Sequence, residues 1–118
     1  MKYRVCQVEE IPRGEKRSYT IKNMPIVVVH SKQGKFYAIY GVCPHHRGPL
    51  AAGVLGGKTE ATQPGQDFQY VREGEILRCP WHGFSFDVTT GACLLASERL
   101  RVKTYPLTID DRQVFLDV

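Results

Sequence analysis

Short runs of alternating or continuous apolar residues, separated by Gly, Pro, Asn and Asp, make up most of the chain. None of them keeps the spacing that predicts a long amphipathic helix. Eight runs have the alternation or the β-branched and aromatic residues that are typical of strands. They cover residues 4–8, 19–22, 26–30, 35–42, 75–79, 84–88, 99–105 and 113–118.

Turn sequences separate several of these runs. Residues 31–34 and 110–112 predict the turns of two hairpins, and residues 89–91 (Thr-Thr-Gly) predict a further turn. Many short strands at close spacing predict an all-β fold, which is an antiparallel β-sandwich or a barrel.

One segment departs from this rhythm. Residues 51–74 contain five of the eleven glycines, one proline and few apolar residues. We expect a long inserted loop around 52–74, with at most a short strand at 68–71. Such a loop could dock a partner or shield a site, and a tolerated surface loop explains it equally well.

The composition is that of one ordinary globular domain spanning 1–118, with 42% hydrophobic and 24% charged residues. The apolar run at 26–29 is far shorter than a membrane-spanning helix, and the first ten residues do not form a signal peptide. Four cysteines are too few for a disulfide scaffold. We therefore expect a cytoplasmic protein with no membrane association.

The net charge of +4 is unevenly distributed. Residues 1–58 hold 10 Lys or Arg against 3 Asp or Glu, whereas residues 59–118 hold 6 against 9. A basic bias of this size fits an acidic protein partner, nucleic acid or simply a solvated surface. No nucleic-acid-binding motif with interleaved aromatic and basic residues is present, so we expect no nucleic acid partner.

Two similar segments carry the strongest chemical signal. Cys43 and His45 are separated by one proline, and Cys79 and His82 by Pro80 and Trp81. Thiolate and imidazole ligands suit zinc, iron or copper. A tetrahedral zinc site usually takes its cysteines from one arm and its histidines from the other, whereas a Rieske [2Fe–2S] centre binds one iron through two cysteines and the other through two histidines. Mixed arms favour the Rieske centre over a zinc-stabilised binding module.

These segments resemble those of the Rieske iron–sulfur proteins. The likeness continues through residues 83–87, 90–91 and 102–107 and so covers nearly the whole chain. It implies an antiparallel β-sandwich or incomplete barrel with two cluster-binding loops at one tip. It also implies one [2Fe–2S] cluster, with Cys43 and Cys79 on the inner iron and His45 and His82 on the outer iron.

Differences from the respiratory Rieske proteins indicate the subtype. Each loop of those proteins has one further cysteine, and the two cysteines form a disulfide; this chain has Gly48 and Trp81 at the matching positions. Those proteins also have a serine shortly after the second histidine that hydrogen-bonds to a cluster sulfur, whereas here Phe84 follows Gly83. Fewer hydrogen bonds to the cluster sulfurs lower the reduction potential. The chain therefore resembles the low-potential, soluble ferredoxins of dioxygenase systems.

Other residues have smaller roles in this interpretation. His46, Arg47, Pro80, Trp81 and Gly83 adjoin the ligands and are candidates for shielding the cluster or docking a partner, although exposure alone would explain His46 and Arg47. We expect Asp87 to serve as a turn or cap residue. Cys6, Cys93 and His30 lie in apolar runs, which predicts core or edge positions for them.

Two further sites are not expected. A mononuclear iron site needs two more histidines and a carboxylate, and only His30 and His46 remain. Residues 52–59 match a relaxed phosphate-loop pattern, but neither a strand before them nor a helix after them is predicted.

The resemblance implies a one-electron carrier, not an enzyme, that passes electrons from a reductase to a terminal oxygenase and is monomeric when free. The alternative is a small Rieske subunit of a larger reductase, such as an assimilatory nitrite reductase. Reduction adds one negative charge to a formally neutral cluster. Protonation of exposed histidine ligands would then make the potential fall as the pH rises.

Overall fold

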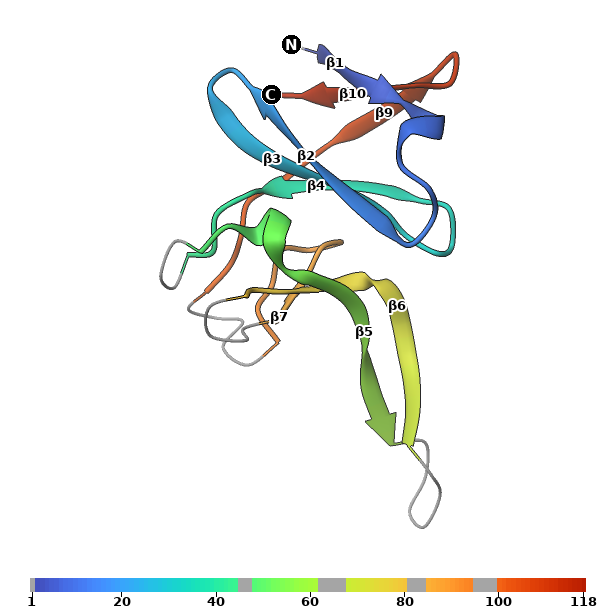
Figure 1. The fold of residues 1–118 in the computed structure, drawn as a ribbon, viewed down its shortest axis with the longest axis vertical. Coiled ribbons are helices and arrows are strands. Elements are labelled where there is room, and N and C mark those ends of the chain that lie inside the picture. The colour runs from blue at the N-terminus through green and yellow to red at the C-terminus, as the bar shows by residue number, and fades with distance from the viewer. Residues whose placement is uncertain (1, 45–47, 62–67, 81–84, 95–99) are drawn as a thin grey trace.

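The computed structural model describes residues 2–44, 48–61, 68–80, 85–94 and 100–118 of the 118-residue chain. These residues form strands in three antiparallel sheets, with two short 3₁₀ helices (Figure 1). The strands are β1 (Lys2–Gln7), β2 (Glu15–Ile21), β3 (Met24–His30), β4 (Phe36–Tyr40), β5 (Val54–Ala61), β6 (Phe68–Arg78), β7 (Ser85–Asp87), β8 (Thr104–Tyr105), β9 (Leu107–Asp110) and β10 (Gln113–Asp117). The helices are η1 (Val8–Glu10) and η2 (Leu50–Ala52).

The central sheet has the order β2-β3-β4-β8, and both of its faces are buried. Successive side chains of a strand point to opposite faces. Ile26 and Val28 accordingly lie in one core and Val27 and Val29 in the other. Burial on both sides explains why β3 is a continuous apolar run instead of an alternating one.

One core lies between the central sheet and the sheet β1-β10-β9. It buries Cys6, Val114 and Leu116 together with Ile26 and Val28 of β3. This sheet holds both ends of the described chain, because β1 and β10 pair antiparallel with Lys2 opposite Asp117 (Figure 1).

The other core lies between the central sheet and the sheet β5-β6-β7. It buries residues of all four elements that flank the candidate ligand loops, namely Ile39 of β4, Leu50 of η2, Leu77 of β6 and Phe86 of β7. The candidate site is built on this core.

The expected loop around 52–74 is largely a hairpin instead. Residues 54–61 and 68–78 form β5 and β6, which pair antiparallel and project away from the body of the molecule (Figure 1). Backbone hydrogen bonds stabilise strands even where few apolar side chains are available. The low apolar content of residues 52–74 therefore predicted a loop where the chain forms strands. The glycines have a local role, because the register shifts between Gly56 and Lys58, as at a β-bulge.

Hairpin turns agree with the expectation at 31–34 and 110–112, where β3–β4 and β9–β10 are joined. Asp111 and Arg112 both have positive φ angles, as do Lys22 and Asn23 between β2 and β3, which suits the right-handed twist of two-residue hairpins. Asp87 is confirmed as a turn residue, since its carboxylate accepts hydrogen bonds from the backbone and hydroxyl of Thr89 at 2.9 and 2.6 Å.

Two strand predictions differ from the structure. Of the predicted run at 99–105, residues 100–105 are described and have a strand only at Thr104–Tyr105, and the sequence did not predict β9. Bounds elsewhere shift by a few residues, whereas the all-β fold class is confirmed, with no closed barrel formed by the described strands. No helix in these segments is long and apolar enough to cross a membrane.

Candidate metal centre

The first candidate loop follows β4 and is closed at its base. Val42 and Pro49 form an isolated antiparallel bridge, and the Cys43 amide donates to the Gly48 carbonyl at 2.8 Å. Cys43 is 1% exposed, whereas Pro44 next to it is exposed. The loop therefore begins with a buried thiol and turns immediately toward solvent.

The second candidate loop follows β6 directly. Arg78, the last residue of β6, pairs with Val54 on one side and with Ser85 on the other. Cys79 comes next and is 2% exposed, while Pro80 is exposed. This loop thus repeats the arrangement of the first, with a buried cysteine followed by an exposed proline.

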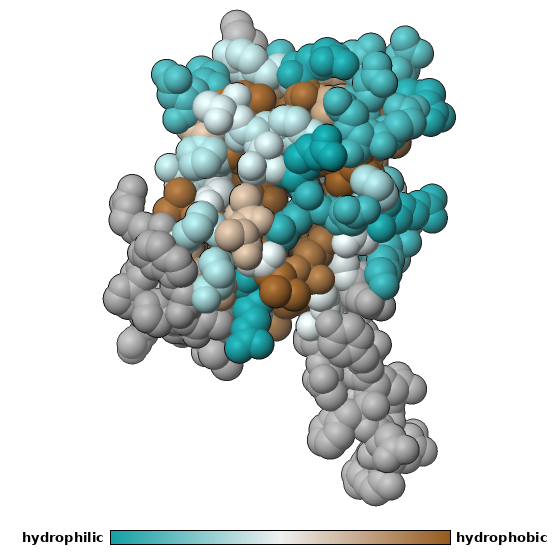
Figure 2. Space-filling model, in the orientation of Figure 1, coloured by the Kyte–Doolittle hydropathy of each residue, from teal (hydrophilic) through white to brown (hydrophobic). Residues whose placement is uncertain are grey.

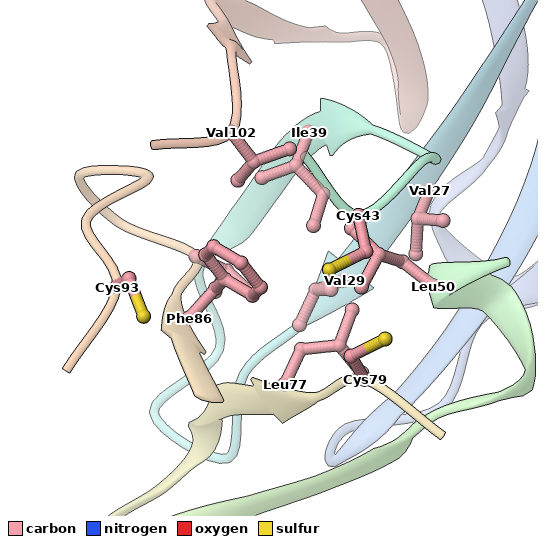
Figure 3. Packing of buried hydrophobic residues seen from close by; sticks show 11 residues of the cluster. Val27, Val29, Ile39, Cys43, Leu50, Leu77, Cys79, Phe86, Cys93 and Val102 are labelled. Carbon is pink, nitrogen blue, oxygen red and sulfur yellow. The ribbon is translucent and has the colours of Figure 1, made fainter. Parts of the chain in front are cut away.

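Cys43 and Cys79 belong to the same buried cluster, although 35 residues separate them in the sequence (Figure 3). Val29, Leu50, Leu77 and Phe86 are other members of this cluster. No disulfide joins any of the four cysteines, all of which are described. Two thiols from two loops in an apolar, water-poor setting are the donor set that the inner iron of a Rieske centre needs, so the described half of the site fits that cluster.

A close backbone approach holds the bases of the two loops together. A Cβ atom on Gly53, which follows η2, would lie 2.1 Å from the carbonyl oxygen of Arg78. Only glycine allows this approach. Lys16 of β2 fixes the same region, because its ammonium donates to the Ala51 carbonyl at 2.5 Å.

The remaining candidates fall outside the described residues. These are His45, His46, Arg47, Trp81, His82 and Gly83. Within the described segments, no group of three or more His, Cys, Asp and Glu residues could hold a metal ion. The assignments of the two histidine ligands therefore stay predictions.

Three residues predicted to be structural are buried, as expected. Cys6 is 1% exposed and Cys93 is 0% exposed, in opposite cores. His30 is 7% exposed, lies 2.7 Å from the Ile11 carbonyl through Nδ1, and stacks on Phe36 with ring centroids 4.0 Å apart. Each has a packing role that needs no metal.

The structure also places a groove beside Cys43 that the sequence did not indicate. It has a volume of about 310 Å³, and its lining includes Tyr40, Pro44, Arg101 and Lys103. Residues more than 60 positions apart meet here, because the Tyr40 amide donates to the Lys103 carbonyl at 2.8 Å. No local pattern in the sequence could have signalled this meeting.

Comparison with known proteins decides the family. The Rieske [2Fe–2S] domain family matches residues 1–106. The chain belongs to this family. The Rieske domain is therefore an electron-transfer protein that carries one [2Fe–2S] cluster, and its homologues are electron-transfer components, not catalytic enzymes.

Three similar proteins illustrate the relationship. The Rieske domain is 28% identical over 109 residues to the ferredoxin component of a Pseudomonas aeruginosa naphthalene 1,2-dioxygenase system, covering 92% of this chain and 88% of the relative. The structure of a Sphingomonas yanoikuyae B1 ferredoxin is 30% identical, with a TM-score of 0.72 and coverage of 100% and 99%. A Mycobacterium tuberculosis protein described as the small subunit of an NADH-dependent nitrite reductase has the same fold, with a TM-score of 0.77, 15% identity and coverage of 98% and 93%.

Proposed function

We propose that the Rieske domain passes single electrons from a reductase to a terminal oxygenase. The observation that carries this proposal is the pairing of Cys43 and Cys79 in one buried cluster, in a chain whose relatives include a dioxygenase ferredoxin. We extend the proposal to a single domain over 1–118 that is monomeric when free and works in the cytoplasm.

In this proposal Cys43 and Cys79 hold the inner iron, and His45 and His82 hold the outer iron. When bound, the [2Fe–2S] cluster supplies a site that accepts and releases one electron. Val29, Leu77 and Phe86 exclude water from the cysteine side, since each is completely buried. Pro44 and Pro80 are exposed and directly precede the histidine-bearing segments in the sequence, which supports a histidine side that faces a partner.

Reduced-state electron paramagnetic resonance tests the ligand set. The purified protein should be red-brown and give the signal of a mixed-ligand cluster. His82→Ala should abolish this signal, and so should His45→Ala, while His30→Ala should keep it because His30 lies away from both loops in the fold. A colourless protein containing zinc would refute the proposal, and family membership already argues against that alternative.

A fixed subunit of a larger reductase is the second candidate. The shared fold with the protein described as a nitrite reductase small subunit favours it, although that likeness concerns the fold alone. Gel filtration of natively extracted protein separates the two candidates. A carrier elutes at the size of one chain, whereas a fixed subunit elutes with its larger partner.

A further inference from the structure

The groove beside Cys43 carries two cations on its rim. Arg101 and Lys103 are both exposed, and Val102 between them is buried in the same cluster as Cys43. Residues two apart on an extended segment project to the same side. The two positive side chains therefore flank one surface groove.

The segment that carries these cations is held in place from both sides. The Val102 amide donates to the Gly91 carbonyl at 2.8 Å, and the Lys103 carbonyl accepts from the Tyr40 amide at 2.8 Å. A Cβ on Gly91 would lie 2.1 Å from the Val102 carbonyl oxygen, so this contact is close. The groove is thus a preformed feature of the fold.

Neither cation is neutralised in the part of the chain that the structure describes. Arg101 donates to the Thr90 carbonyl at 2.9 Å, and the Lys103 ammonium lies 5.2 Å from the centroid of the Tyr105 ring. These contacts orient the side chains but leave their charges uncompensated. Among the residues that the structure describes, no acidic side chain lines the groove.

The geometry points to this groove as the docking site for a carboxylate-bearing surface of the electron-donating reductase. Two uncompensated cations suit acidic side chains, and they lie beside the loop of Cys43. The reductase is chosen as the partner because of the charge that the cluster gains on reduction. The carrier gains one negative charge when it accepts an electron, so an acidic surface in the groove binds the oxidised carrier more tightly than the reduced one and releases it after electron transfer.

This inference rests on the proposed electron-carrier function and adds the partner surface to it. A fluorescein-labelled hexaglutamate peptide serves as the probe, and anisotropy at low ionic strength measures its binding to the oxidised, cluster-loaded protein. The double variant Arg101→Gln/Lys103→Gln should bind about fivefold more weakly, as expected for the loss of two exposed ion pairs. Arg101→Lys/Lys103→Arg, which keeps both charges, should bind nearly as the parent does.

Arg17→Gln/Lys35→Gln is the matched control, because it removes the same charge from two exposed residues outside the groove. It should bind the peptide nearly as the parent does. Equal weakening in both double variants would mean that only net charge matters and would overturn the docking site. So would an absence of peptide binding by the parent protein.

The second measurement is the midpoint potential with and without saturating peptide. The peptide should lower the potential of the parent protein and leave that of Arg101→Gln/Lys103→Gln nearly unchanged. A raised or unaltered parent potential would overturn the inferred preference for the oxidised carrier. If either peptide test fails but the parent protein still gives the Rieske signal, only the docking site is refuted and the electron-carrier function stands. If the parent protein gives no Rieske signal, the proposed function itself is refuted.

Discussion

Gly53 and the carbonyl oxygen of Arg78 approach so closely that a Cβ on Gly53 would lie 2.1 Å from that oxygen. The Gly53 Cα and the Arg78 carbonyl oxygen are both backbone atoms, so neither can move away without a shift of η2 or of the end of β6. Gly53→Ala should therefore lower the free energy of unfolding by about 1–3 kcal/mol, the usual cost of overpacking. Urea denaturation measures this loss.

The same substitution should reduce the amount of cluster bound per chain, because it forces the two loops apart. Ala52→Ser, an exposed neighbour, is the control and should leave both stability and cluster content unchanged. Normal stability of Gly53→Ala would show that this backbone contact is not tight.

The four buried cysteines should divide into two functional pairs. Cys43→Ala and Cys79→Ala should abolish the visible spectrum of the cluster, because each removes a thiolate ligand in the proposed site. Cys6→Ala and Cys93→Ala should keep the spectrum and cost about 1 kcal/mol of stability as small core truncations. Absorption spectra and denaturation of all four variants check the division, and loss of the cluster in Cys93→Ala would contradict it.

Tyr19 should make the protein less stable at high pH. Burial and the neighbouring Cys6 thiol raise the pKa of Tyr19 to about 12, against about 10 in an unfolded chain. The unfolded state then loses its proton first, so the stabilising effect is complete below about pH 10 and is lost as the pH rises toward 12. Denaturation at several pH values should show this decline, and Tyr19→Phe should make it shallower.

Tyr19→Phe should also leave stability at pH 7 unchanged or slightly higher. The Tyr19 hydroxyl is buried, and the Cys6 thiol beside it is at best a weak hydrogen-bonding group, so removal of the hydroxyl relieves a desolvation penalty. Tyr3→Phe at a half-buried position of β1 is the control. A clear loss of stability in Tyr19→Phe would indicate that the hydrogen bond between its hydroxyl and the Cys6 thiol is strong.

The reduction potential should lie near the lower end of the Rieske range, which runs from about −150 to +300 mV. Gly48 and Trp81 exclude the disulfide of the respiratory proteins, and Phe84 replaces a hydrogen-bonding serine. A spectroelectrochemical titration measures the midpoint. A value well above zero would show that other hydrogen bonds compensate for the missing ones.

The distal part of the β5–β6 hairpin should be dispensable for cluster binding. Thr59 pairs with Tyr70 and Lys58 with Val71, so an Asn-Gly turn between Lys58 and Val71 would close a shorter hairpin in place of residues 59–70. The shortened protein should keep the Rieske spectrum. A slower rate of electron transfer from its reductase would then assign a docking role to the distal hairpin, and an unchanged rate would identify a tolerated extension.

The all-β class could be predicted because turn residues and alternating runs are local properties. The Asp111–Arg112 turn and the apolar β3 are examples in which neighbouring residues determine the outcome. The β5–β6 hairpin was missed because its strands are stabilised by hydrogen bonds between backbones, which leave little trace in apolar content. β8 is shorter than predicted because only Thr104 and Tyr105 pair with β4.

The candidate site could be proposed from the sequence for a different reason. A cysteine and a histidine at close spacing in each arm specify ligand chemistry whatever the fold. The proximity of Arg101 and Lys103 to Cys43 was not predictable, since it depends on how the chain after Gly91 crosses the end of β4. Such contacts between distant segments need the three-dimensional structure.

The pairing of Lys2 with Asp117 has a practical consequence for bioelectronics. Both chain ends lie on the sheet that covers one face of the central sheet, whereas Cys43 and Cys79 lie in the core on its other face. Figure 1 shows the two ends together at one extremity of the molecule. An electrode linker or a fused reductase attached at either end would leave the cysteine-bearing loops accessible. The N-terminus or the C-terminus could therefore be chosen to suit the geometry of the device.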